Sequence, residues 1–225
     1  MAERITLTTI DDMKIIGDWV PAPTVVGAAL LLHMSPETSS SWSSVQLALA
    51  KRGVASLAID LRGHGRSTQN IDGQTFSYET FTDQEHRSSS LDVSAAVSWI
   101  RTRGIDLNRI VLIGASIGAN LAILELTEEP RLAGAVLLSP GLEYHGVDIS
   151  EELENVIYDQ HLLIIAAEDD AKPFAESQQI YHDLPVANKT FTPYQRGGHG
   201  TNMFKTETKL VDTIAEWTAN LIKGA

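Results

Sequence analysis

A serine lies between two glycines in Gly114-Ala115-Ser116-Ile117-Gly118, where a run of apolar, mostly β-branched residues ends and a helical pattern begins. Such a serine is either a structural turn residue or a nucleophile. Its hydroxyl becomes a strong nucleophile only when a histidine takes its proton and a carboxylate fixes the tautomer of that histidine. The nucleophile hypothesis therefore requires one carboxylate and one histidine elsewhere in the chain.

Both residue types follow later predicted strands. The acidic run Glu168-Asp169-Asp170 follows a predicted strand at 162–167, and His199 follows another at 190–194. In open parallel sheets, the active groups gather at the carboxyl ends of the strands. The order serine, acid, histidine therefore predicts nucleophilic catalysis by Ser116, and Gly114 and Gly118 would remove clashes between the serine turn and the neighbouring strand and helix.

The elements that must position these residues alternate along the chain. Two segments at 4–9 and 13–20 alternate apolar and polar residues and predict an antiparallel hairpin. Beyond residue 25, apolar strands alternate with helices, which predicts an α/β fold with a mostly parallel sheet of about eight strands and helices on both faces. No repeat or linker interrupts this order, so we expect a single domain over residues 1–225. The predicted strands are 25–32, 54–59, 110–113, 132–138, 162–167 and 190–194, and the predicted helices are 41–52, 88–103, 117–127, 172–183 and 202–223.

Composition narrows the function classes. The 225 residues are 43% hydrophobic and 20% charged, as in ordinary soluble proteins, and the net charge of −12 argues against a nucleic-acid partner. The absence of cysteine excludes disulfides and thiolate chemistry, and no pair of histidines has metal-binding spacing. We expect no metal, no cofactor and no membrane contact. The N-terminus lacks the pattern of a signal peptide, which favours a cytoplasmic protein, and the oligomeric state is open.

Several motifs together resemble the α/β-hydrolase superfamily over nearly the whole chain. They are LLLHMSPE (30–37), AIDLRGHGRS (58–67), GASIG (114–118), IIAAEDD (164–170) and GGHGT (197–201). G-x-S-x-G and the chain order Ser, Asp, His are signatures of that fold. The chain is most similar to small, lidless esterases of the dienelactone-hydrolase-like group. That group often uses a cysteine nucleophile, and the serine here favours ordinary ester chemistry.

The resemblance also implies roles for particular residues. The family places the acid four residues before a proline, so Pro173 selects Asp169, with Asp170 as the alternative. It implies an oxyanion hole made by the N–H of Ile117 and the N–H of Ser35, with Met34 as the alternative second donor. The family usually has a glycine after the histidine that corresponds to His33, and this chain has Met34 instead.

Other histidines are expected to be structural. His64, between glycines in Arg62-Gly63-His64-Gly65, is expected to bond to turn backbone, and His33 to anchor a buried loop. Glu143, Tyr144 and His145 follow a strand end and are placed to touch substrate, but no role is assigned to them.

The function expected is a serine carboxylesterase that cleaves short-chain esters of small molecules through an acyl-enzyme. The alternatives are a thioesterase or small peptidase with the same machinery, or a low-turnover ligand-binding protein that keeps the three residues. Only about twenty residues separate Gly141 from Gln160, which is too little chain for a multi-helix cap. One short helix at 150–158, capped by Ser150, is expected there.

Overall fold

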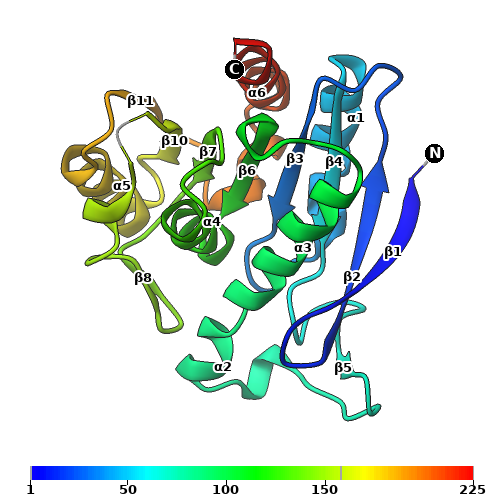
Figure 1. The fold of residues 1–225 in the computed structure, drawn as a ribbon. Coiled ribbons are helices and arrows are strands. Elements are labelled where there is room, and N and C mark those ends of the chain that lie inside the picture. Colours follow the sequence, from blue (N-terminus) through cyan, green and yellow to red (C-terminus); the bar gives the residue numbers. More distant parts are fainter. Residues whose placement is uncertain (1, 158, 225) are drawn as a thin grey trace.

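The centre of the protein is a sheet with the strand order β1-β2-β4-β3-β6-β7-β10-β11, and a short strand, β5, pairs with β2 (Figure 1). The structure is a computed structural model that describes residues 2–157 and 159–224. β2 is antiparallel to β1, β4 and β5, and all the pairs from β4 to β11 are parallel. A separate hairpin, β8–β9, follows β7. The strands are β1 Glu3–Thr8, β2 Met13–Val20, β3 Gly27–Leu32, β4 Val54–Ile59, β5 Gln69–Asn70, β6 Ile110–Ala115, β7 Gly134–Leu138, β8 Glu143–Tyr144, β9 Val147–Asp148, β10 His161–Ala167 and β11 Asn188–Tyr194.

Helices cover both faces of this sheet. α3 and α4 pack on one face, in front of the strands in Figure 1, together with buried side chains of α5, while α1 and α6 pack on the other face. No helix among the described residues is long and apolar enough to cross a bilayer. The α-helices are α1 Ser43–Lys51, α2 Asp83–Arg87, α3 Ser90–Thr102, α4 Ile117–Glu128, α5 Ala171–Asp183 and α6 Leu210–Gly224, and the short 3-10 helices are Ser39–Trp42, Tyr78–Thr80, Leu107–Arg109, Leu153–Asn155 and Gly200–Lys205.

Burial explains why these sequences form these elements. Every residue of β3, β4, β6 and β7 is buried, because helices cover both faces of the strands. In β1, at the edge of the sheet, Ile5 and Leu7 are buried and the other residues of the strand are exposed. Each fully buried large apolar side chain contributes about 1.5–3 kcal/mol. The predicted α/β fold with its N-terminal antiparallel hairpin is confirmed.

The C-terminal helix is shorter than predicted. The expected helix at 202–223 is divided into a 3-10 helix, Gly200–Lys205, and α6, which begins at Leu210. The first part closes on itself, with the Thr206 N–H donating to the Met203 carbonyl oxygen, and buries Met203. The helical periodicity of the sequence did not reveal this break.

The segment after β7 forms a hairpin and a single helical turn, and the predicted helix at 150–158 is not formed in the described residues. Within 150–157 the only helical turn is the 3-10 helix Leu153–Asn155, and Tyr158 lies outside the described residues. Ser150 does not cap this turn, because the N-cap position is occupied by Glu152, and the Ser150 N–H donates to the Asp148 carboxylate. The β8–β9 hairpin and α2 lie at the same end of the molecule (Figure 1). Between β7 and β10 the described residues contain this hairpin and one 3-10 turn, and therefore no multi-helix cap.

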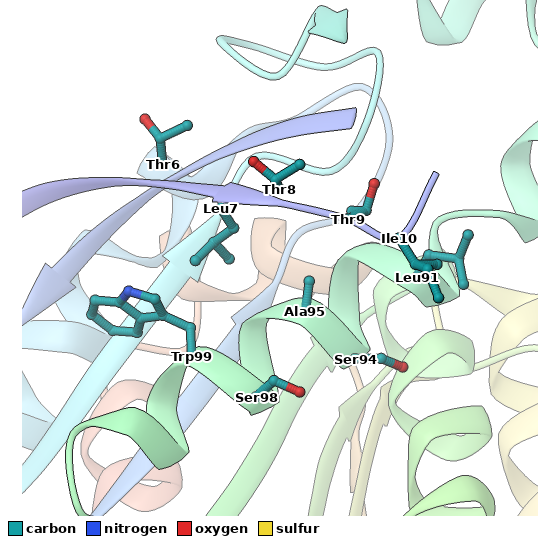
Figure 2. A pocket seen from close by; sticks show the side chains of 10 residues that line it. All are labelled: Thr6, Leu7, Thr8, Thr9, Ile10, Leu91, Ser94, Ala95, Ser98 and Trp99. Atoms are coloured by element: carbon teal, nitrogen blue, oxygen red, sulfur yellow. The ribbon is translucent and has the colours of Figure 1, made fainter. Parts of the chain in front are cut away.

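A groove of about 720 Å³ runs between edge strand β1 and α3 (Figure 2). Leu7 on the strand and Trp99 on the helix line it, and Thr6 and Thr8 lie on the strand beside it. No residue that the sequence predicted for the chemistry lines this groove. The chemistry must be sought at the carboxyl ends of the parallel strands.

Candidate active site

Ser116 occupies the turn between β6 and α4 in a strained backbone conformation. Its φ of 53° and ψ of −122° lie in a region that residues with a side chain rarely adopt. The Ser116 N–H donates to the Leu138 carbonyl oxygen at 2.9 Å, and the Ser116 carbonyl oxygen accepts from Ala119 and Asn120 in α4. These bonds fix the turn, and only 7% of the Ser116 surface is exposed.

The two flanking glycines make the turn possible, as predicted. A Cβ atom at Gly114 would collide with the Gly118 backbone at the start of α4. A Cβ atom at Gly118 would collide with the carbonyl oxygens of Leu32 and His33 at the end of β3. Helix α4 can therefore begin close to both strands only if these positions carry no side chain.

His199 pairs with Asp170 and not with Asp169. The Asp170 carboxylate oxygen Oδ2 lies 2.5 Å from His199 Nδ1. The Asp169 carboxylate instead accepts the backbone N–H groups of Gly197 and Gly198, at 3.1 and 3.0 Å from its Oδ1. The carboxylate paired with the histidine ring is thus that of Asp170, the alternative in the sequence analysis, because a shift of one residue after β10 changes which carboxylate faces the ring.

Asp169 supports the turn that carries His199. The N–H groups of Gly198 and Gly197 hold the pKa of the Asp169 carboxyl below its usual value, so the group stays ionised as an acceptor. Asp170 bonds to the His199 ring, and Asp169 bonds to the backbone of the turn that carries His199. The two neighbouring carboxylates therefore have separate structural tasks.

Ser139, directly after β7, links the His199 turn to the strands beside Ser116. Its hydroxyl accepts the Gly200 N–H at 3.0 Å, and its own N–H donates to the Ile165 carbonyl oxygen at 2.7 Å. Like Ser116, it has a positive φ, 48°. The His199 turn is therefore fixed next to the Ser116 turn, although no hydrogen bond of the described residues joins the Ser116 hydroxyl to His199.

The loop after β3 reaches the turn that carries His199 and Gly200. The Met34 side chain fills the space beside Gly200, where a Cβ would come 2.7 Å from the sulfur. The Met34 carbonyl oxygen accepts from the Glu37 N–H and from His33 Nδ1. The Ser35 hydroxyl lies 3.4 Å from His64 Nε2. Met34 and Ser35 thus flank the site, and Ile117 is the first residue of α4.

His33 and His64 are structural, as predicted. His33 Nε2 accepts the Leu61 N–H at 2.9 Å while its Nδ1 bonds to the Met34 carbonyl oxygen, so both ring nitrogens are used. His64 Nδ1 bonds to the Arg62 carbonyl oxygen. Burial lowers the pKa of His33 and that of His64 to about 4, so both rings are neutral at pH 7.

Tyr144, to which the sequence analysis assigned no role, lies beside His199 in the site. Its hydroxyl donates to the Ser139 carbonyl oxygen at 3.0 Å, and its ring packs edge-on against the His199 ring, with centroids 5.9 Å apart. Burial raises the pKa of Tyr144 and the Asp170 charge raises it further, while the polar Ser116 side chain acts in the opposite direction. Its position just after a strand at the carboxyl edge was the signal that could have identified it.

The described part of the chain places no group of possible metal ligands beside these residues. In residues 2–157 and 159–224, no three histidine or acidic side chains are grouped closely enough to hold a metal ion. The groups that the described residues bring to the site are a hydroxyl, an imidazole, carboxylates and backbone N–H groups.

The chain belongs to the hydrolase family described as serine aminopeptidase, S33, which it matches over residues 24–156. Together with the strand order, this confirms an α/β-hydrolase and a hydrolytic enzyme class, while the dienelactone-hydrolase-like subgroup stays a prediction. A bifunctional esterase/perhydrolase of Acinetobacter calcoaceticus is 30% identical over 189 residues, which cover 80% of this chain. The matched region is 58% of that relative, so the chain spans little more than half its length.

Two solved structures share the fold. The Pyrococcus furiosus esterase Pf2001 superposes with a TM-score of 0.78 at 18% identity, covering 98% of this chain and 90% of the other. Est1E of Butyrivibrio proteoclasticus, solved with ferulic acid, superposes with a TM-score of 0.78 at 16% identity, covering 97% of this chain and 100% of the other. At these identities the likeness establishes the fold alone.

Proposed function

We propose that the chain is a serine carboxylesterase acting on short-chain esters of small molecules. Ser116 is the nucleophile, His199 the general base, and Asp170 the carboxylate that orients His199 and stabilises its cation. The observation that carries the proposal is the strained Ser116 turn held beside the hydrogen-bonded Asp170–His199 pair. The Acinetobacter relative, described as an esterase, supports the substrate class.

The mechanism follows the acyl-enzyme scheme. Ser116 Oγ attacks the ester carbonyl carbon while His199 Nε2 takes the hydroxyl proton, and the N–H of Ile117 and that of Ser35 or Met34 bind the oxyanion. The C–O bond to the alcohol then breaks, and His199 gives its proton to the leaving alcohol. Water attacks the acyl-enzyme with His199 again as base, which releases the carboxylic acid and restores the Ser116 hydroxyl.

The small cover over the site supports a short-chain preference. The chain after β7 contributes one hairpin and one 3-10 turn, which leave little apolar wall for a long acyl chain. A methylene group contributes about 0.8 kcal/mol only where it is removed from water. We therefore expect kcat/KM to stop rising after the short acyl chains.

Replacing the nucleophile tests the proposal most directly. Ser116→Ala should lower kcat for p-nitrophenyl acetate by about 10⁶ and keep the circular dichroism spectrum of the wild type. The wild type should also be labelled covalently by a fluorophosphonate, and Ser116→Ala should not. Retention of a tenth of the wild-type activity by the pure variant would exclude Ser116 as nucleophile. The wild-type profile over p-nitrophenyl esters from acetate to palmitate tests the chain-length claim.

A small peptidase is the second candidate, because the matching family is described as a serine aminopeptidase. The same nucleophile and base can cleave amides, which need stronger protonation of the leaving group. Matched p-nitroanilide and p-nitrophenyl substrates separate the two functions. A kcat/KM for amino-acid anilides equal to or above that for acetate esters would favour the peptidase, and a thioester in the same series tests the thioesterase alternative.

A further inference from the structure

The β8–β9 hairpin is fixed rigidly to the start of the nucleophile helix. Asn120, one turn after Ser116 in α4 and completely buried, accepts the Gly141 N–H with its side-chain oxygen and donates from Nδ2 to the Val147 carbonyl oxygen at 2.9 Å. One side chain thus holds both sides of the hairpin. At the tip, Gly146 lies so close to Asp83 of α2 that no side chain would fit. The hairpin is therefore a fixed wall of the site.

Tyr144 projects from this wall onto the reacting groups. Its hydroxyl is anchored on the Ser139 carbonyl oxygen, and its ring packs edge-on against the His199 ring. Gly141 lies beneath the ring, where a Cβ atom would come 2.8 Å from two ring carbons. The ring is thus enclosed by the hairpin on one side and the histidine on the other.

The path of the proton to the leaving group indicates which half of an ester lies beside Tyr144. His199 must deliver its proton to the oxygen of the departing alcohol, so the alcohol lies on the His199 side of the scissile bond. A side chain that packs against the His199 ring therefore borders the alcohol half of an ester. The acyl half lies away from His199.

We propose that Tyr144 determines which alcohols the enzyme accepts. Its ring limits the size of the alcohol subsite, so that only small alcohol groups fit. This inference rests on the proposed esterase function and adds a specificity residue to it. The ring sets the size limit, and the hydrogen bond to Ser139 keeps the ring in place. The Tyr144 hydroxyl bonds to the Ser139 carbonyl oxygen, and the Ser139 hydroxyl in turn accepts the Gly200 N–H of the His199 turn.

Substitutions of Tyr144 separate the ring from its hydroxyl. Kinetics are measured with methyl, butyl and benzyl acetate, and separately with methyl esters from acetate to octanoate, with released acid followed by a pH indicator. Tyr144→Ala should raise the kcat/KM of benzyl acetate relative to methyl acetate by at least about tenfold, since each methylene buried in the new space contributes about fourfold. Tyr144→Phe should keep the wild-type ratio within about twofold, because the ring remains.

Tyr181→Ala is the matched control. Tyr181, on α5, is also partly buried and packs against Phe191 and Lys189, and none of its aromatic or cation–π contacts involves a site residue. Its loss should leave the benzyl-to-methyl ratio unchanged. If Tyr144→Ala does not fold, Tyr144→Leu gives the same comparison with a smaller expected increase.

Three outcomes decide the proposal. An increase confined to the alcohol series supports it. An unchanged ratio in a folded, active Tyr144→Ala or Tyr144→Leu variant overturns it, and so does a change confined to the acyl series. Failure of the esterase function itself is recognised independently, because Ser116→Ala would then retain ester hydrolysis whatever Tyr144 does.

Discussion

His199 and His33 both follow the carboxyl end of a strand, yet their surroundings differ in every respect that matters for proton transfer. His199 has a carboxylate on Nδ1, and its side chain is 30% exposed. His33 is completely buried and uses both nitrogens on backbone groups, the Met34 carbonyl oxygen and the Leu61 N–H. A base needs a free nitrogen and a partner that stabilises its cation. His199 has the cation-stabilising partner and His33 has neither.

The same substitution at the two histidines should give the largest contrast. His199→Gln should lower kcat for p-nitrophenyl acetate by about 10⁶, because the nucleophile loses its base. His33→Gln should keep kcat within about tenfold of the wild type, or about 1.4 kcal/mol in the barrier. Purified, folded variants are compared at pH 7. Equal losses would show that the two histidines cannot be distinguished by their hydrogen-bond partners.

The two carboxylates beside His199 provide a finer test. Asp170→Asn should lower kcat by about 10⁴, because the amide favours the wrong histidine tautomer. Asp169→Asn should have a much smaller effect on kcat, since an amide oxygen can still accept an N–H from Gly197 or Gly198. Steady-state kinetics of the two variants check this order. If Asp169→Asn is the weaker enzyme, the carboxylate that faces the histidine during turnover is not the one paired with it here.

The pH dependence of stability should show the smallest effect, and it concerns His33. Its pKa of about 4 in the folded state lies below the ordinary value of 6.5, so the unfolded chain takes up the proton first as the pH falls. The histidine therefore destabilises the fold progressively from about pH 6.5 down to pH 4, by up to about 3 kcal/mol. His33→Gln lacks this titration.

Urea unfolding of the wild type and His33→Gln at pH 7 and pH 4.5 checks this difference. The wild type should lose about 2–3 kcal/mol more than the variant over this range, whatever the other groups contribute to both proteins. Identical losses in the two proteins would mean that His33 does not remain neutral in the folded state.

The sequence by itself determined the architecture, and it pointed to two of the three residues proposed for catalysis. Apolar strands such as 54–59 and 110–113 alternate with amphipathic helices, and this pattern has few solutions other than a covered parallel sheet. The glycines at 114 and 118 specified a tight strand-to-helix turn at Ser116, because only a missing side chain permits it. The only histidine directly after the last predicted strand was His199.

The tertiary structure decided what depends on contacts between distant segments. Asp169 and Asp170 have the same side chain and adjacent positions, and only the path of the 197–199 turn determines which carboxylate meets His199. Tyr144 enters the site because a buried amide on α4 holds its hairpin, and no local pattern encodes that contact. Local periodicity and turn chemistry depend on neighbours in sequence, whereas the partner of a carboxylate or a phenol depends on packing between elements that the sequence separates.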